Sequence, residues 1–277
     1  MADDQLHETS SVFNIFKRKV NSAGLRLIHL LEKNFKKWPE QFCLITGAPR
    51  SGTTAVESWL NSQDKVTALH ETRILIAVHR FLEETNRHKS FWGRKKLVSS
   101  GRNLAYDFYR SRCTMIENKL LIDKEPLEPI AFPDKNYALF LQNYRLIFPN
   151  GKLLFMVRDP FAAIWSMKKR KWGHSLNNYT PRSFPIDTHI QNWCDCADLI
   201  LDYAGDENCY VCSFEKLVNN PQAESARIFE FLQLNDGGIF QPRPVKNIRF
   251  DEEQRLQIEQ KTRVQMNKLR ERKLVDI

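Results

Sequence analysis

Short apolar runs alternate with helical stretches between residues 41 and 232 of the chain. The runs have the length and the apolar composition of buried strands, and turn residues interrupt the pattern between them. This alternation is typical of an α/β fold, and it predicts a three-layer sandwich in which helices flank a central, mostly parallel sheet of about five strands. The expected strands are residues 41–47, 65–69, 119–123, 152–157 and 208–214, and the expected helices are residues 51–61, 72–84, 101–117, 136–148, 160–169, 187–203 and 221–232.

The two ends of the chain differ in pattern from the middle. Residues 1–40 are polar and basic with one weakly amphipathic patch, "LRLIHLLEKNF", and they predict an N-terminal helical extension. Residues 41–250 carry the alternating pattern of one domain. Residues 251–277 predict a charged helix with a thin apolar stripe, packed on the domain or extending from it.

Composition adds little to the prediction of fold and function. The 277 residues include 42% hydrophobic residues, which is enough for a core, and 42 Lys and Arg against 33 Asp and Glu leave a net charge of +9. The charge favours an anionic ligand, although the basic residues are scattered as on a solvated surface. Because no membrane span or signal peptide is recognisable, we expect a cytoplasmic protein whose six cysteines are reduced thiols.

Four cysteines lie close enough in the sequence to be candidate zinc ligands. Cys194 and Cys196 lie in a helical pattern, whereas Cys209 and Cys212 lie in an expected strand. An offset of three residues points strand side chains to opposite faces, so we expect no metal site there.

Polar residues collect where the expected strands end. The carboxyl ends of parallel strands meet at one edge of the sheet, where open α/β proteins bind their ligands. The residues at these positions are Arg50 to Thr54, then His70 with Glu71, then Lys124, and then Arg158 with Asp159. The pattern therefore predicts an anion-binding loop, a carboxylate and two cations at the same edge.

The stretch "LITGAPRSGTT" has the glycine spacing of a phosphate-binding P-loop, with Gly47 and Gly52 enclosing four residues. Thr53 stands where that motif has its lysine. Backbone N–H groups at a helix N-terminus still form a cradle for a phosphate-like group. We therefore expect an anion site made by five consecutive residues, Arg50, Ser51, Gly52, Thr53 and Thr54.

The stretch "VRDPFAAIWSMKKR" predicts a second anion contact. Asp159 suits the N-cap of a helix and Pro160 suits its first position. Arg158 then lies at the strand end, while Ser166 and Arg170 are four residues apart and share one helix face.

Together the two motifs resemble those of the sulfotransferases that use 3′-phosphoadenosine 5′-phosphosulfate (PAPS). In that family a "PRSGTT" loop, here Pro49 to Thr54, binds the 5′-phosphosulfate. An arginine and a serine eight residues later, here Arg158 and Ser166, bind the 3′-phosphate. The resemblance covers about residues 42–234 and implies the P-loop-like sulfotransferase fold.

The spacing is most similar to the tyrosylprotein branch of the family. "HETRIL" resembles the segment with that branch's catalytic glutamate, which implies Glu71 as the base. "DKEP" resembles the segment that places a lysine, here Lys124, near the leaving phosphate. Arg170 matches a further cofactor-binding arginine and Arg73 a substrate-contacting one, while Phe214 replaces a tyrosine that contacts the cofactor.

The resemblance implies in-line transfer of a sulfuryl group from PAPS to a hydroxyl or amine, with release of 3′,5′-ADP. Glu71 would take the acceptor proton, and Lys124 with Arg50 would stabilise charge on the departing phosphate, without a metal. Because no membrane anchor is recognisable, we expect a small-molecule acceptor, as in the tailoring of natural products, and no nucleic-acid or membrane partner. The sequence does not define the oligomeric state, and a homodimer stays open.

Two other functions were considered. A P-loop kinase or NTPase would use Asp123, after the apolar run "LLI", to bind magnesium, but Thr53 replaces its lysine. A nucleic-acid-binding module would explain the positive charge, but the C-terminal tail has no aromatic residue for stacking. The acceptor, the loop Lys171 to Pro185 and the basic segment Arg243 to Arg249 receive no assignment from the sequence.

Overall fold

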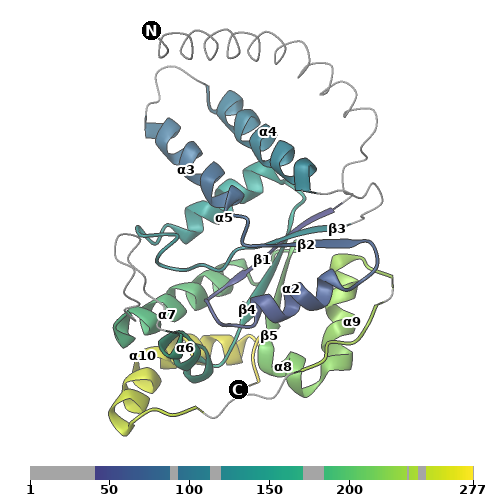
Figure 1. Ribbon diagram of the computed structural model, residues 1–277. Coiled ribbons are helices and arrows are strands. Elements are labelled where there is room, and N and C mark those ends of the chain that lie inside the picture. Colours follow the sequence, from purple (N-terminus) through teal and green to yellow (C-terminus); the bar gives the residue numbers. More distant parts are fainter. Residues whose placement is uncertain are drawn as a thin grey trace, which may run out of the picture. The chain divides into compact units, whose positions relative to one another are not determined.

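A computed structural model of the chain describes residues 41–87, 93–112, 120–170, 184–235, 237–242 and 248–276, all of which belong to one unit. Its sheet is parallel throughout, with the strand order β2-β3-β1-β4-β5 (Figure 1). The expected fold class is therefore confirmed. The expected N-terminal extension, residues 1–40, lies outside the described residues. The strands are β1 (Gln41–Gly47), β2 (Val66–His70), β3 (Leu120–Lys124), β4 (Lys152–Val157) and β5 (Cys209–Ser213).

The helices follow the expected pattern with two differences. Helix α4 begins at Arg94 rather than at Gly101. Its first two turns are mostly polar, so the sequence shows no helical apolar pattern there, although the helix packs along α3. Helix α8 was not expected; the side chain of Ser213 accepts a hydrogen bond from the N–H of Lys216 and so ends β5 and starts a helix. The helices are α2 (Thr53–Asn61), α3 (Ile74–Arg87), α4 (Arg94–Arg112), α5 (Tyr137–Ile147), α6 (Pro160–Lys169), α7 (Ile186–Tyr203), α8 (Phe214–Asn219), α9 (Pro221–Leu232) and α10 (Glu252–Glu271).

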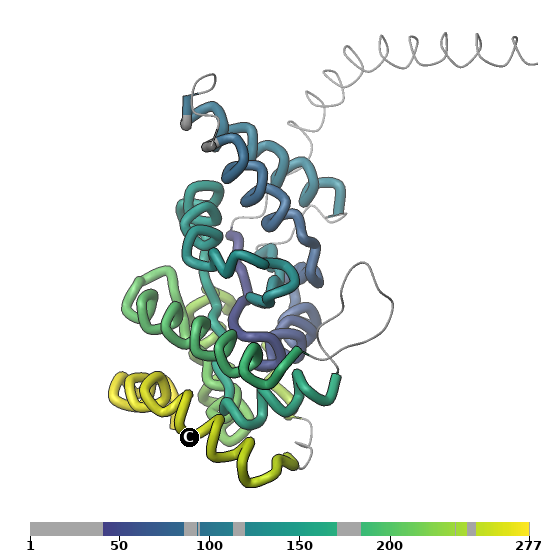
Figure 2. Tube along the Cα trace, turned by 90° about the vertical axis from the view of Figure 1, so that its left-hand side faces the viewer, coloured from purple at the N-terminus to yellow at the C-terminus, as the bar shows by residue number. Residues whose placement is uncertain are grey.

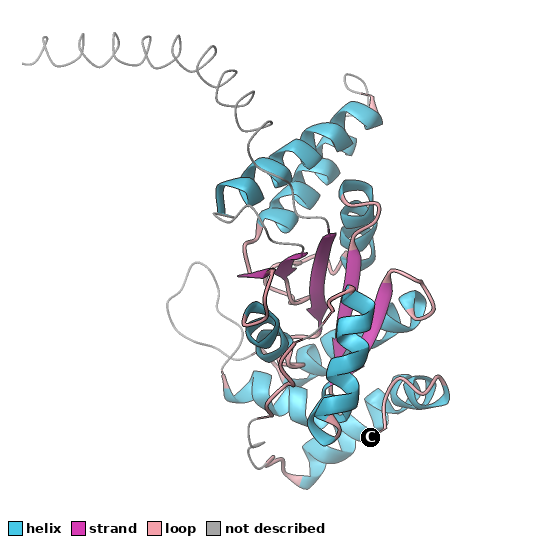
Figure 3. Ribbon diagram, turned by 90° about the vertical axis from the view of Figure 1, so that its right-hand side faces the viewer, coloured by secondary structure: helices cyan, strands magenta, loops and turns pink. Residues whose placement is uncertain are grey.

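Alternate side chains of each strand pack against different helices, which produces three layers (Figure 3). On one face, Ile45 and Ile122 belong to a buried cluster that includes residues of α2, α8 and α9. On the other face, Phe42 contacts Tyr109 of α4, and Phe155 contacts Tyr203 of α7. Because both faces are covered, the strands are mostly apolar and carry their charged residues at or near their ends, as in other parallel sheets.

The end of β1 is crowded by its neighbours. Gly47 has a φ of 135°, and a Cβ atom there would lie 2.3 Å from the carbonyl oxygen of Met156 in β4. On the other side, the segment after β3 continues alongside β1, since Glu125 donates its N–H to Ile45 and Leu127 donates to Gly47. This close approach brings the ends of three strands together at one edge.

The C-terminal helix α10 lies against α7 and α6 (Figure 2). It buries Ile258, Thr262, Met266 and Leu269 although most of its surface is charged. Phe250, just before the helix, packs edge-on against Trp165 of α6. Helix α10 therefore supports the helix on which the second anion motif lies.

We predict that Gly47→Ala destabilises the protein more than Gly205→Ala. Both glycines have a positive φ, but nothing lies within 4 Å of a Cβ atom at Gly205. Gly205→Ala should therefore lower the free energy of unfolding by about 1–2 kcal/mol through backbone strain alone. Gly47→Ala adds a clash with β4 and should cost about 3 kcal/mol or more. Urea denaturation measures both values, and equal losses would contradict the role assigned to the contact with Met156.

Candidate active site

The loop between β1 and α2 turns sharply just before α2 begins. Arg50 and Gly52 have φ angles of 68° and 97°, in the left-handed region. Only glycine fits at position 52, because a Cβ atom there would lie 2.3 Å from the ring of Phe214. Ser51 is buried, and its hydroxyl has no hydrogen-bond partner among the described residues. An unpaired buried donor beside a helix N-terminus fits an anion.

The second motif lies directly against this loop. Arg50 donates from Nε to Ser166 Oγ at 2.9 Å, and Arg158 donates from Nη1 to the carbonyl oxygen of Arg50 at 3.1 Å. The guanidinium of Arg158 also lies 4.7 Å from the centre of the Phe214 ring. Burial, and then the charges of Arg170 and Arg158, lower the pKa of Arg50. A bound anion would relieve this crowding of positive charge.

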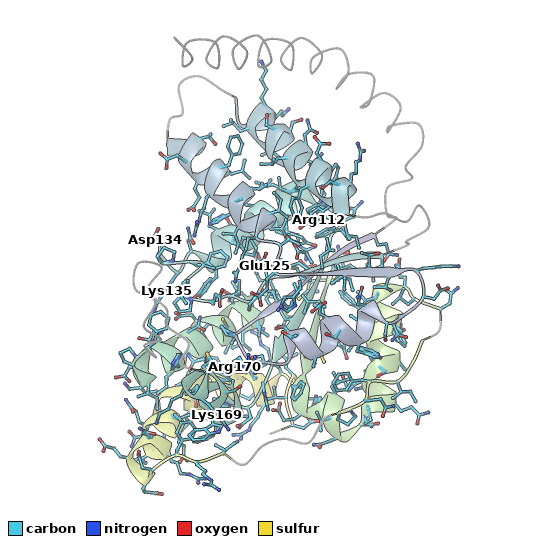
Figure 4. All side chains as sticks on the ribbon, viewed as in Figure 1. Arg112, Glu125, Asp134, Lys135, Lys169 and Arg170 are labelled. Atoms are coloured by element: carbon cyan, nitrogen blue, oxygen red, sulfur yellow. The ribbon has the colours of Figure 1, made fainter. Side chains whose placement is uncertain are left out.

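Helix α6 begins as expected. Asp159 is its N-cap and accepts a hydrogen bond from the N–H of Ala162 at 2.8 Å, with Pro160 in the first turn. Arg170 is the C-cap residue, one position past the helix, and it is exposed; Figure 4 labels it at the end of α6.

One cavity of about 620 Å³ joins the two motifs to Glu71. Of the predicted residues, it is lined by Arg50, Gly52, Thr53, Thr54, Glu71, Arg158 and Arg170. Ser51, Arg73, Lys124 and Ser166 do not line it, but the last three are hydrogen-bonded to residues that do.

Another part of the cavity wall, formed by Trp59 and residues 238–241, was not predicted from the sequence. Trp59 of α2 donates from Nε1 to the carbonyl oxygen of Gly238 at 2.6 Å, and Gly238 donates its N–H to Gln63. These contacts hold the segment 238–241 against α2, where it lines the cavity with Phe214. Trp59 lies on the helix that follows the anion loop. Its position in the first turns of that helix could have indicated that it lines the site. No local pattern marks the segment 238–241, which is far away in the sequence.

Lys124 and Glu71 form a buried ion pair beside the loop. The Nζ atom of Lys124 donates to Glu71 Oε1 at 2.5 Å and to Thr54 Oγ1 at 3.1 Å, and the lysine side chain is 1% exposed. Burial alone would raise the pKa of Glu71, but the hydrogen bond and charge of Lys124 outweigh it, with a further contribution from Arg73, and lower that pKa. Glu71 is thus a carboxylate at neutral pH, as a general base must be.

Arg73 is held by carboxylates of the protein itself. Its Nη2 atom lies 2.9 Å from Glu71 Oε2 and 2.5 Å from Glu128 Oε1, and its backbone N–H donates to Glu125. Burial, and then the charge of Asp123, raise the pKa of Glu125 to about 8, although Arg73 Nη1 lies 3.4 Å from its Oε2 atom. Figure 4 labels Glu125 just beyond β3. The side chain of Arg73 is 41% exposed, and its expected contact with a substrate stays a prediction.

Asp123 faces the opposite side of the sheet from Lys124. Its carboxylate accepts hydrogen bonds from Tyr109 of α4 at 2.6 Å and from Thr72, and burial raises its pKa. The residue is fully buried. It is therefore directed away from the loop, where a kinase would need it for magnesium.

Neither a metal-binding cluster nor a membrane-spanning helix is found among the described residues. Within the ranges given above, no three or more His, Cys, Asp and Glu side chains are grouped so that they could hold a metal ion. Cys194 and Cys196 lie on α7, whereas Cys209 and Cys212 lie on β5. In the same part of the chain, no helix has both the length and the apolar character needed to span a bilayer.

Comparison with known proteins agrees with the geometry. The model of the sulfotransferase family matches residues 43–237. Protein-tyrosine sulfotransferase A of Caenorhabditis elegans is 28% identical over 202 residues, which cover 70% of this chain and 50% of the relative. Nodulation protein NoeE of Sinorhizobium fredii is 25% identical over 223 residues, which cover 71% and 51%. The chain thus spans about half the length of these curated relatives.

A solved structure supports the fold. The sulfotransferase from Alicyclobacillus acidocaldarius aligns with a TM-score of 0.57 and 16% identity, over 87% of this chain and 98% of the other. At this identity the likeness extends to the fold alone. The family match covers well over half of the chain, including the anion loop, Glu71, Lys124 and the α6 motif, so the chain belongs to the sulfotransferase family.

Proposed function

We propose that this protein transfers the sulfuryl group of PAPS, in line, to a hydroxyl or amine of a small-molecule acceptor and releases 3′,5′-ADP. The observation that supports this most directly is the single cavity that joins the anion loop, the arginines near α6 and the carboxylate of Glu71. A donor with phosphate groups at two positions requires such paired cationic sites, and transfer requires a base beside one of them.

The residues present fit this nucleotide. The N–H groups at the start of α2, together with Gly52, Thr53 and Thr54 in the cavity wall, would hold the 5′-phosphosulfate. Ser166 and the guanidinium groups of Arg158 and Arg170 would hold the 3′-phosphate side, while Arg50, bonded to Ser166, would stay with the 5′-phosphosulfate. When bound, PAPS supplies an activated sulfuryl group on a phosphate leaving group.

The side chains around Glu71 are arranged for proton removal and charge stabilisation. Glu71 would take the acceptor proton on a carboxylate oxygen, an effect worth about 10²- to 10⁴-fold in rate. Lys124 and Arg50 would stabilise negative charge on the leaving oxygen. If Lys124 moves its hydrogen bond from Glu71 to that oxygen, Glu71 loses the partner that lowers its pKa and becomes a stronger base.

The acceptor is proposed to be a small molecule, such as a natural product, modified in the cytoplasm. The relatives include protein-tyrosine sulfotransferases, so a tyrosyl peptide is the comparison that any acceptor screen requires. Labelled PAPS with pooled small hydroxyl and amine compounds, run beside a tyrosyl peptide, distinguishes the two classes.

We predict that 3′,5′-ADP stabilises the protein against heat and that ATP does not. At about 100 times its dissociation constant the bisphosphate should add about 2.7 kcal/mol. Ser166→Ala removes a contact to a charged group and should weaken binding about 10- to 100-fold. Ser111→Ala, at the end of α4, serves as the control. Equal shifts with both nucleotides, or unchanged affinity in Ser166→Ala, would count against the assigned site.

We predict that Glu71→Gln keeps the thermal shift with 3′,5′-ADP and loses at least about 10²-fold in sulfuryl transfer. Glutamine preserves the shape of the side chain but cannot accept the acceptor proton. Turnover with labelled PAPS measures the effect, and transfer at the wild-type rate would show that Glu71 is not the base.

We predict that Lys124→Met shifts the acidic side of the pH profile of kcat/KM to higher pH. This side of the profile reports ionisation of Glu71 in the free enzyme, where Lys124 helps to lower the pKa of Glu71. A lowered pKa means that the carboxylate persists to lower pH and is lost only as the pH falls through that value. Removing the lysine raises the pKa, so activity should be lost earlier on acidification. If the acidic side of the profile does not shift, Lys124 does not lower the pKa of Glu71.

A further inference from the structure

A histidine and a buried glutamate form a pair next to Lys124 that the proposed mechanism does not use. His70 is the last residue of β2, and Glu57 lies in the second turn of α2. The Nδ1 atom of His70 lies 2.8 Å from Glu57 Oε2, and its Nε2 atom lies 3.4 Å from Lys124 Nζ. The Nε2 atom is also 3.9 Å from Glu71 Oε1.

The contact with Glu57 decides which nitrogen of His70 carries the proton. Glu57 is buried, with a side chain 8% exposed, and an ionised carboxylate can only accept hydrogen bonds. Nδ1 is therefore the donor, and in the neutral ring Nε2 keeps a lone pair. This lone pair faces the ammonium of Lys124, which can only donate.

Lys124 thus has three acceptors for its three protons: Thr54, Glu71 and His70. Of the three, only the bond to Glu71 has to be given up when the lysine turns to the leaving oxygen in the proposed reaction. The bonds to Thr54 and His70 can remain, because neither group takes part in proton transfer from the acceptor. A nearly fully buried ammonium needs such partners to stay charged and in place.

We propose that the Glu57–His70 pair positions Lys124 for catalysis. The neutral Nε2 atom of His70 holds the ammonium while its third hydrogen bond passes from Glu71 to the leaving oxygen. Glu57 keeps the ring in the tautomer that can do this. The inference rests on the proposed function, since it assigns Lys124 to the leaving group.

The arrangement makes transfer sensitive to protonation of the ring. The charged groups that face His70 are Glu57 from α2, Lys124 from β3 and Glu71 in the next position of the chain. A protonated ring has no lone pair for Lys124 and places a second positive charge beside it. The rate of transfer should therefore fall as His70 takes up a proton, and this part of the pH profile should be absent when the histidine is replaced.

His70→Gln and His70→Asn separate positioning from a merely structural role. The amide oxygen of glutamine reaches about as far as Nε2 and can still accept from Lys124, whereas the shorter asparagine reaches only the level of Nδ1. We expect His70→Asn to lower kcat about 10- to 100-fold, as for loss of a hydrogen bond to a charged group. We expect His70→Gln to recover most of the rate and to lose the pH-dependent step of the wild type.

Glu57→Gln tests the orienting contact, with Glu230→Gln on the exposed side of α9 as the matched control. We expect Glu57→Gln to lower kcat with little change in KM, and Glu230→Gln to change neither. Nitrogen NMR of the imidazole provides a readout that does not depend on activity. The wild type should show the Nδ1–H tautomer, and Glu57→Gln should show a mixture of tautomers.

The outcomes distinguish this inference from the proposed function. Wild-type kcat and pH profile in His70→Asn, or an Nε2–H tautomer in the wild type, would overturn the positioning role while transfer itself continues. Equal loss in His70→Gln and His70→Asn would also overturn it, because a hydrogen-bond acceptor would then not be what Lys124 needs. If the wild type neither binds 3′,5′-ADP nor uses PAPS, the proposed function fails first. The thermal shift with 3′,5′-ADP, measured for each variant, confirms that the fold and the nucleotide site are retained.

Discussion

The buried ammonium of Lys124 is the interaction on which the rest of the site depends. The protons of a lysine that is 1% exposed need acceptors from the protein, and here the acceptors come from the start of α2, the end of β2 and the residue after it. Three segments that are distant in sequence therefore have to meet within hydrogen-bonding distance of one atom. The parallel sheet makes this meeting possible, because β1, β2 and β3 are neighbours and end at the same edge.

The loop resembles a nucleotide-binding P-loop from which the lysine has been removed, and the structure shows where a cation is found instead. Thr53 occupies the lysine position of the motif, while Lys124 reaches Thr54 from the adjacent strand. One residue earlier in β3, Asp123 points to the other face of the sheet and is bonded to Tyr109 and Thr72. The alternation of side chains along β3 thus brings a lysine to the loop and keeps an aspartate away from it, which is the reverse of what a magnesium-dependent kinase needs.

Charge is divided between the two sides of the cavity. The guanidinium groups of Arg50, Arg158 and Arg170 gather on one side, where burial and the charges of the other two arginines lower the pKa of Arg50, so that side favours an anion. On the side of Glu71, Lys124 pairs with Glu71 and Arg73 pairs with both Glu71 and Glu128, while burial raises the pKa of Glu125 to about 8. The net charge of +9 by itself indicates neither the group of arginines nor the ion pairs around Glu71, since it sums the charges of the surface and of the site.

Local patterns in the sequence were enough to predict the five strands, most helices, the N-cap at Asp159 and the loop from Arg50 to Thr54, because buried strands, caps and tight turns need particular residue types at neighbouring positions. They also indicated which residues follow the strands and so share an edge. Tertiary structure alone decided that Arg73 is held by Glu71 and Glu128, that His70 lies between Glu57 and Lys124, and that the segment 238–241 forms part of the cavity wall. These contacts join residues whose spacing along the chain is arbitrary, so they depend on how the layers pack and leave no periodic trace in the sequence.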